Sequence, residues 1–138
     1  MTYISILFLV INSFFQTDVP TFDSYSSTLQ VGEALQFEGK SVRFKEIISD
    51  SRCPKGVTCI WAGEAKVLVE ILEDGELCGE RELTISGAAE AVSLQQLFPG
   101  ESISLLPAVL APYPEISKEI VREDYKLSLQ VRVKKKQQ

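Results

Sequence analysis

Nine residues near the end of the chain alternate strictly between apolar and polar side chains. The apolar set is Tyr125, Leu127, Leu129, Val131 and Val133, and the polar set between them is Lys126, Ser128, Gln130 and Arg132. Because successive side chains of a strand point to opposite faces, this pattern predicts a strand with one face buried and the other in water. It is the clearest secondary-structure signal in the sequence.

Shorter signals of the same kind occur along the rest of the chain. Apolar residues stand two apart at Leu29 and Val31, Leu35 and Phe37, Val42 and Phe44, Leu83 and Ile85, and Ile103 and Leu105. Residues 65–72 are apolar on both parities apart from Lys66 and Glu70, which predicts a central strand covered on both faces. Only residues 88–98 look helical. About eight short strands with at most one short helix predict an all-β fold, an antiparallel β-sandwich, Ig-like or barrel-like, over residues 28–133.

The sequence Asp74-Gly75 predicts a hairpin turn, and its register is informative. A two-residue loop with unbroken pairing would set Val67 opposite Glu82 and place carboxylates against the apolar face. A three-residue loop, or a bulge at Gly79, would instead pair Val67 with Leu83. One of these two arrangements is required if the hairpin exists.

The first sixteen residues contain none of the chain's charged side chains, and residues 4–11 are a compact apolar run. Such a run has the size of a signal-peptide core and is too short to span a membrane. We therefore predict a signal peptide over 1–16, a polar linker over 17–27 and a solvated basic tail over 134–138. The mature chain is expected to be exported, periplasmic or extracellular, without a transmembrane span.

Residues 50–64 carry the densest local signal, DSRCPKGVTCIWAGE. Five residues separate Cys53 from Cys59, and Pro54 and Gly56 bend the chain between them. In an oxidising compartment the two cysteines most simply form an intraloop disulfide. The alternative is a redox-active or metal-binding dithiol. The odd cysteine, Cys78, is expected to be a buried free thiol.

Four residues in or near this loop have both a structural and a binding interpretation. Trp61, the only tryptophan, is expected to plug the core under the disulfide, or else to be an exposed anchor for a partner. Asp50 and Arg52 are expected to form a local turn with an ion pair. Tyr113 belongs to a stiff segment, residues 107–114, whose three prolines interrupt strand pairing, and it is expected to pack against the loop or to face a partner.

The loop motif also carries a resemblance. The string DSRCPKGVTCIWAGEAKV, the downstream APYP at residues 111–114 and the strand DYKLSLQV at residues 124–131 resemble a family of small uncharacterised bacterial secreted proteins and lipoproteins. That family shares a D-S-R-C-P…C-x-W-A-G loop followed by a Pro-Tyr-Pro segment. The resemblance covers roughly residues 31–133 and implies export, a β-rich fold and a Cys53–Cys59 bridge. It implies no activity.

Composition narrows the classes of function. The chain of 138 residues has 14 basic and 19 acidic side chains, a net charge of −5 and no histidine. A net negative charge argues against nucleic-acid binding, and the absence of histidine excludes Ser-His and Cys-His nucleophile pairs. No spacing singles out a carboxylate pair or a calcium loop. We therefore expect no enzyme activity, no metal site and no cofactor.

These observations predict an exported, non-catalytic β-sandwich module of the cell envelope that binds an unidentified protein or glycan through its stiffened loop. The candidate contact residues are Asp50, Arg52, Trp61 and Tyr113. The first alternative is a secreted proteinase inhibitor, whose stiffened loop would insert into a protease cleft at low entropic cost. The second is a thiol or metal-binding protein that uses Cys53, Cys59 and Cys78.

Overall fold

A computed structural model of the chain describes residues 19–86 and 103–135. These residues form seven strands and one short 3-10 helix. In chain order they are β1 (Phe22–Gln30), β2 (Ala34–Phe37), β3 (Lys40–Asp50), β4 (Glu64–Glu73), β5 (Glu76–Ser86), β6 (Ile103–Ala111), η2 (Arg122–Asp124) and β7 (Lys126–Lys134). Within the described ranges, no helix has the length and hydropathy needed to cross a membrane. The helix expected over residues 88–98 lies outside the described residues.

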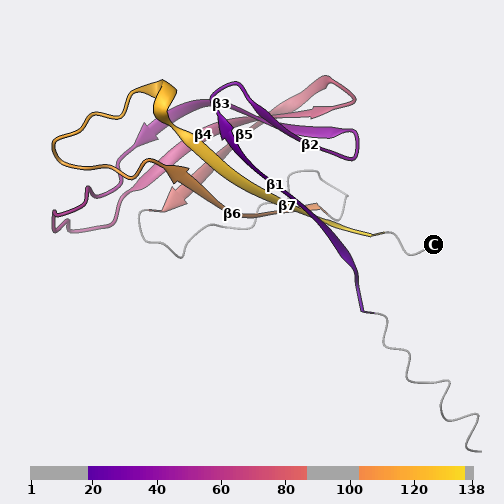
Figure 1. Cartoon of the computed structure of the whole chain (residues 1–138), viewed down its shortest axis with the longest axis horizontal. Coiled ribbons are helices and arrows are strands. Elements are labelled where there is room, and N and C mark those ends of the chain that lie inside the picture. The colour runs from indigo at the N-terminus through magenta and orange to yellow at the C-terminus, as the bar shows by residue number, and fades with distance from the viewer. Residues whose placement is uncertain (1–18, 87–102, 136–138) are drawn as a thin grey trace, which may run out of the picture.

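The strands form two antiparallel sheets (Figure 1). One has four strands in the order β2-β3-β4-β5, and the other has three in the order β1-β7-β6. Apolar side chains from both sheets form a single buried cluster, so the sheets face each other as two layers around one core. The predicted all-β, antiparallel, sandwich-like fold is confirmed.

Strand β7 shows why the alternating pattern was informative. Leu127, Leu129, Val131 and Val133 are buried in the core, and the residues between them face outward. The strand lies in the middle of its sheet, paired with β1 on one side and β6 on the other.

The β4–β5 hairpin resolves its register through a bulge. Asp74 and Gly75 form a two-residue turn with φ of +51° and +83°, the positive angles that this turn requires. The ladder then shifts by one residue, and Cys78 is the extra residue on β5. Val67 is consequently paired with Leu83, and both are buried. The bulge alternative is thus confirmed, one position before the expected Gly79.

The linker predicted over 17–27 is wrong from Phe22 onward, because β1 begins there and pairs with β7 along its whole length. Lys134, expected in the basic tail, is the last residue of β7 and lies opposite Phe22. The Ser-rich composition of β1 obscured the strand, since only Tyr25 and Leu29 give its inward face apolar side chains that reach the core.

Two further expectations need correction. Strand β4 is central, but its side chains alternate between buried and half-buried over most of its length, so only one face is fully covered. The polar Lys66 and Glu70 lie on the other face, in ion pairs with neighbouring strands. The segment expected to interrupt pairing is strand up to Ala111, and its proline at position 107 falls in an irregularity of the β6–β7 ladder between Leu106 and Val109.

Candidate functional site

The cysteine loop, residues 51–63, joins β3 to β4 at one end of the sandwich. Beside it lies the segment that joins β6 to β7, residues 112–125 (Figure 1). The two segments touch through the backbone, since the Lys55 N–H donates to the Pro114 carbonyl at 3.0 Å. Lys55 and Glu115 also form a parallel β-bridge. The loop is therefore fastened to a segment that lies about 60 residues away in the sequence.

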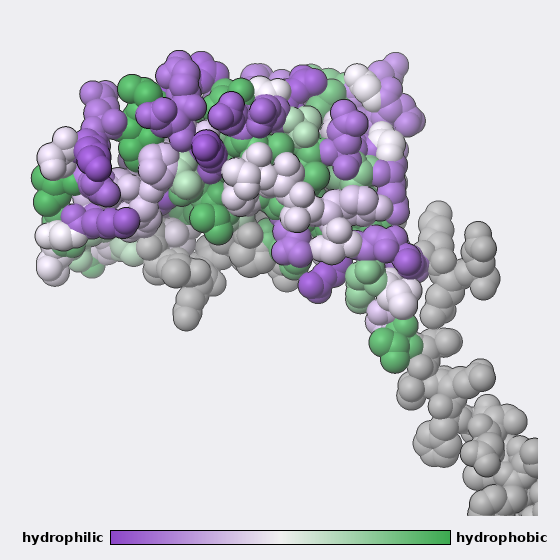
Figure 2. All heavy atoms as spheres, in the orientation of Figure 1, coloured by the Kyte–Doolittle hydropathy of each residue, from purple (hydrophilic) through white to green (hydrophobic). Residues whose placement is uncertain are grey.

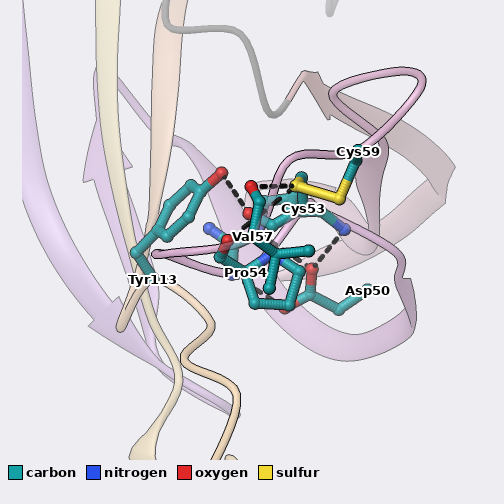
Figure 3. Close-up of a disulfide and its surroundings, with 7 residues drawn as sticks. Asp50, Cys53, Pro54, Val57, Cys59 and Tyr113 are labelled. Atoms are coloured by element: carbon teal, nitrogen blue, oxygen red, sulfur yellow. Dashed lines mark hydrogen bonds and ion pairs between the residues drawn. A yellow bond between two sulfur atoms is a disulfide. The ribbon is translucent and has the colours of Figure 1, made fainter.

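The predicted disulfide is present in the loop (Figure 3). Cys53 and Cys59 are joined with an S–S distance of 2.09 Å and a Cα–Cα distance of 6.0 Å. Between them Gly56 takes a φ of +81°, in the region that favours glycine. Residues 53–59 are thus closed into a small ring at the end of the sheet.

Beneath the ring lies a buried charged group, the Arg52 guanidinium, which is 5% exposed. Its Nε donates to Asp50 Oδ1 at 2.8 Å, and one terminal nitrogen donates to Asp50 Oδ2 at 2.7 Å. The remaining donors go to backbone carbonyls of the neighbouring segment, Leu110 at 2.7 Å and Pro112 at 3.1 Å. A buried charge is tolerated only when it is paired and hydrogen-bonded in this way. The predicted Asp–Arg pair is confirmed, and it lies in the interior.

A hydroxyl from a third segment completes this network. Tyr125 donates its O–H to Asp50 Oδ2 at 3.0 Å. Burial alone would raise the pKa of Asp50, but the hydrogen bonds and charge of Arg52, with the Tyr125 hydroxyl, lower it overall. Burial, followed by the hydrogen bond to Asp50 and its charge, raises the pKa of Tyr125 to about 12. Asp50 is therefore held as a carboxylate that is fully occupied by its partners.

Both arms of the loop are fixed by further contacts. The Cys53 N–H donates to the Ala62 carbonyl at 2.8 Å, and the Tyr113 hydroxyl donates to the Cys53 carbonyl at 2.8 Å (Figure 3). The Tyr113 ring also lies under the Arg52 guanidinium, 5.2 Å from its centroid. Gly63 has a φ of +70° and lies close to the backbone of Ser51. A Cβ added at Gly63 would lie 1.9 Å from the Ser51 carbonyl oxygen. Tyr113 thus packs against the loop, as the structural interpretation predicted.

The end of the loop is apolar and exposed. Trp61 is 63% exposed, Ile60 is fully exposed and Val57 is 41% exposed. We call these three residues the loop tip. Ile116 is exposed on the adjacent segment. Figure 2 shows hydrophobic side chains at the surface on the end of the molecule where the loop lies, among hydrophilic ones. Aromatic and aliphatic side chains held outward on a stiffened loop are typical of contact surfaces.

The preferred interpretation of Trp61 as a core plug is wrong. Arg52 and Asp50 occupy the space beneath the loop, and the core behind them is closed by Tyr125 and its neighbours. Trp61 follows the disulfide ring, which closes at Cys59, and it is 63% exposed. Of the four predicted contact residues, Trp61 alone is largely exposed at this surface. Asp50 and Arg52 pair with each other in the interior, and Tyr113 donates to the loop backbone at Cys53.

Cys78 also differs from expectation, because it is exposed and has no disulfide partner. It is the extra residue of the bulge next to the β4–β5 turn. The cysteine loop precedes β4 and this turn follows it, so Cys78 lies at the opposite end of a ten-residue strand from Cys53 and Cys59. The three cysteines do not form a single site.

Two residues that matter here were not selected from the sequence. Ile60 stood beside the tryptophan as an apolar residue within a turn-rich loop, which was a usable signal. Tyr125 was assigned to the inner face of the last strand. Its hydroxyl contacts Asp50, which is 75 positions away, and no local sequence pattern predicts a contact over that separation.

Fold and loop together define an all-β, sandwich-like, disulfide-containing domain with an exposed apolar loop. No family model, curated protein or solved structure matches the chain.

Proposed function

We propose that this chain is an exported, non-catalytic module of the cell envelope that binds a protein partner through the loop tip. The observation that carries the proposal is the exposure of Ile60 and Trp61 on a loop fixed by a disulfide and by buried Arg52. Because the loop is already ordered, binding costs little conformational entropy. A Trp anchor buried on binding is worth on the order of 2–4 kcal/mol.

The chemistry of the tip favours a protein over a glycan at this site. Sugar rings are bound by aromatic faces together with polar groups that pair with the hydroxyls. Here the exposed tip combines Trp61 with the aliphatic Ile60 and Val57, whose side chains offer no hydrogen bonds, and Thr58 supplies the one hydroxyl among residues 57–61. An exposed apolar projection fits a concave apolar pocket on a partner protein.

The proposed export of the chain and its proposed non-catalytic role are each supported by one observation. A disulfide such as Cys53–Cys59 persists in oxidising compartments, which supports an exported protein, periplasmic or extracellular. The acidic group at the site, Asp50, is buried and saturated by Arg52 and Tyr125, so it supports the loop and does not meet a substrate.

A second candidate function, proteinase inhibition, is favoured by the way both arms of the loop are held. The Cys53 N–H and Ala62 carbonyl tie the arms together below the tip, and Tyr113 ties the first arm to the neighbouring segment. A loop held at both arms can occupy a protease cleft without reordering. Stoichiometric inhibition in a panel of proteases, lost when the disulfide is reduced, would establish this function.

The test of the proposal is capture from native envelope extract with three forms of the full chain. These are the parent, the tip variant Ile60→Ser with Trp61→Ser, and a matched control, Val19→Ser with Leu77→Ser, which removes two apolar side chains exposed elsewhere. We expect the parent and control to retain the same protein partner and the tip variant to lose it by ~10-fold or more. Equal capture by all three forms would contradict the proposal, and retention of a glycan by the parent would reassign the tip.

A further inference from the structure

The outer face of the three-stranded sheet carries a set of side chains unlike the rest of the surface. Alternate positions of β1 and β7 point away from the core, together with the outward positions of β6. We call this set the sheet face. It comprises Phe22, Ser24, Ser26, Thr28 and Gln30 on β1, Lys126, Ser128, Gln130, Arg132 and Lys134 on β7, and Ser104, Leu106, Val109 and Ala111 on β6. In Figure 2 pale, weakly polar side chains run across the middle of the molecule over β1 and β7.

The sheet face contains three cations and no carboxylate, in a chain whose net charge is −5. Lys126 and Lys134 have no ion pair among the described residues, and Arg132 lies over the Phe22 ring at 5.7 Å. On the outer face of the four-stranded sheet, by contrast, lysines are paired with carboxylates. There Lys45 pairs with both Glu70 and Glu80, and Lys66 with Glu82. Within residues 19–86 and 103–135, no carboxylate forms an ion pair with the cations of the sheet face.

The polar groups between the cations are already ordered. Thr28 and Ser128 share a hydrogen bond of 3.0 Å across the β1–β7 pair, and the Gln130 amide donates to the Ser24 hydroxyl at 2.8 Å. Each hydroxyl keeps a further donor or acceptor for a ligand. These hydrogen bonds already restrict the side-chain rotamers before any ligand binds. Binding a ligand to the hydroxyl and amide rows would therefore cost less conformational entropy.

The dimensions favour an extended ligand of low charge density. Outward positions on a strand recur every two residues, so the five on β7 extend over about 27 Å. On β7 Lys126 and Arg132 are about 20 Å apart and Arg132 and Lys134 about 7 Å apart, whereas a nucleic-acid strand carries one charge per ~3.4 Å. The sheet face also has one aromatic ring, Phe22, where single-strand binding relies on several stacking platforms.

We propose that the sheet face binds an acidic polysaccharide, a polymer whose carboxylates are separated by neutral, hydroxyl-rich sugar units. Lys126, Arg132 and Lys134 bind the carboxylates. The hydroxyl and amide rows between them contact the sugar hydroxyls, and Leu106 and Val109 offer apolar contact to the ring faces. The sheet face and the loop tip share no residues, so the experiment on one site can contradict its proposal without affecting the proposal for the other.

The experiment measures binding of hyaluronate, whose carboxylate-bearing sugars alternate with neutral ones, to the full chain at low salt, with dextran as the uncharged comparison. The face variant is Lys126→Gln, Arg132→Gln, Lys134→Gln. The matched control is Lys55→Gln, Arg81→Gln, Lys118→Gln, which removes the same charge from exposed positions elsewhere. We expect the face variant to lose affinity by ~10-fold or more and the control by less than ~2-fold. Equal losses in both would show diffuse charge attraction and overturn the site.

A second variant separates sugar contact from charge. Thr28→Ala with Ser128→Ala keeps all three cations, and we expect it to weaken hyaluronate binding by ~3-fold with an unchanged salt dependence. No effect of this variant would overturn the contact with sugar hydroxyls. Tighter binding of single-stranded DNA or of phosphatidylglycerol vesicles than of hyaluronate would overturn the ligand class. Trp61→Ala is expected to leave hyaluronate binding unchanged.

Discussion

The Arg52 guanidinium holds the Asp50 carboxylate through two hydrogen bonds, of 2.8 and 2.7 Å, beneath the loop that carries the exposed tryptophan. The same guanidinium donates to two carbonyls of the neighbouring segment, and Tyr125 donates to the same carboxylate. One buried ion pair therefore joins β3, the end of β6 and the start of β7. It positions the loop independently of the disulfide.

Removing one member of this pair is expected to cost far more than removing a surface charge. Arg52→Met leaves Asp50 buried without its partner, so we expect the free energy of unfolding to fall by about 3–5 kcal/mol in urea denaturation. Lys45→Met, which breaks the exposed ion pairs with Glu70 and Glu80, is expected to have a far smaller effect because solvent screens those charges. A loss in Arg52→Met no larger than in Lys45→Met would show that the network does not support the fold.

The raised pKa of Tyr125 predicts a loss of stability at alkaline pH. The folded chain keeps this proton up to about pH 12, whereas the unfolded chain releases it near the ordinary tyrosine pKa of 10.0. The contribution is thus fully present below pH 10 and is lost as the pH rises from 10 to 12, and it is on the order of 2 kcal/mol. Unfolding by urea across this range should show the decline, and Tyr125→Phe should remove that part of it. A decline of equal size in Tyr125→Phe would contradict the assignment.

Two glycines of the cysteine loop should respond differently to the same substitution. Gly63→Ala places a Cβ 1.9 Å from the Ser51 carbonyl oxygen at a φ of +70°, so the loop must move and we expect a loss of several kcal/mol. Gly56→Ala has a similar φ of +81° with nothing within 4 Å, and we expect a loss of about 1 kcal/mol. Thermal unfolding of both variants would test the difference, and equal losses would refute the close approach at Gly63.

The cysteines should give a definite thiol count. Because Cys78 is exposed and Cys53 is bonded to Cys59, one thiol per native chain is expected to react with a thiol reagent without denaturant. Cys78→Ser should reduce the count to zero. A count of three would show an absent disulfide, and a thiol that reacts only after unfolding would show that Cys78 is buried.

The sequence was most informative where one strand could be judged by its own pattern. Residues 125–133 alternate because one face meets the core and the other meets water, so their assignment needed no knowledge of partners. The hairpin register was also predictable, since carboxylates on β5 had to be kept from the apolar face of β4. The first part of β1, residues 22–27, was missed because its Ser-rich sequence is stabilised by pairing with β7, which no local pattern reveals.

The candidate site was predicted in its parts but not in its arrangement. The disulfide and the Asp50–Arg52 pair are local and followed from spacing. The inward position next to the loop is taken by Arg52, a buried residue bound to carbonyls 58 and 60 positions away, and Trp61 is exposed. Contacts over such separations are set by the packing of the two sheets, and for this reason the tryptophan was expected inside.

The claim that the loop tip serves contact and not the core is tested most directly by the stability of Trp61→Ala. Because Trp61 is 63% exposed, we expect the free energy of unfolding of Trp61→Ala, followed by circular dichroism in urea, to stay within about 0.5 kcal/mol of the parent. A loss of about 3–5 kcal/mol, the size found when a buried tryptophan is truncated, would contradict the account.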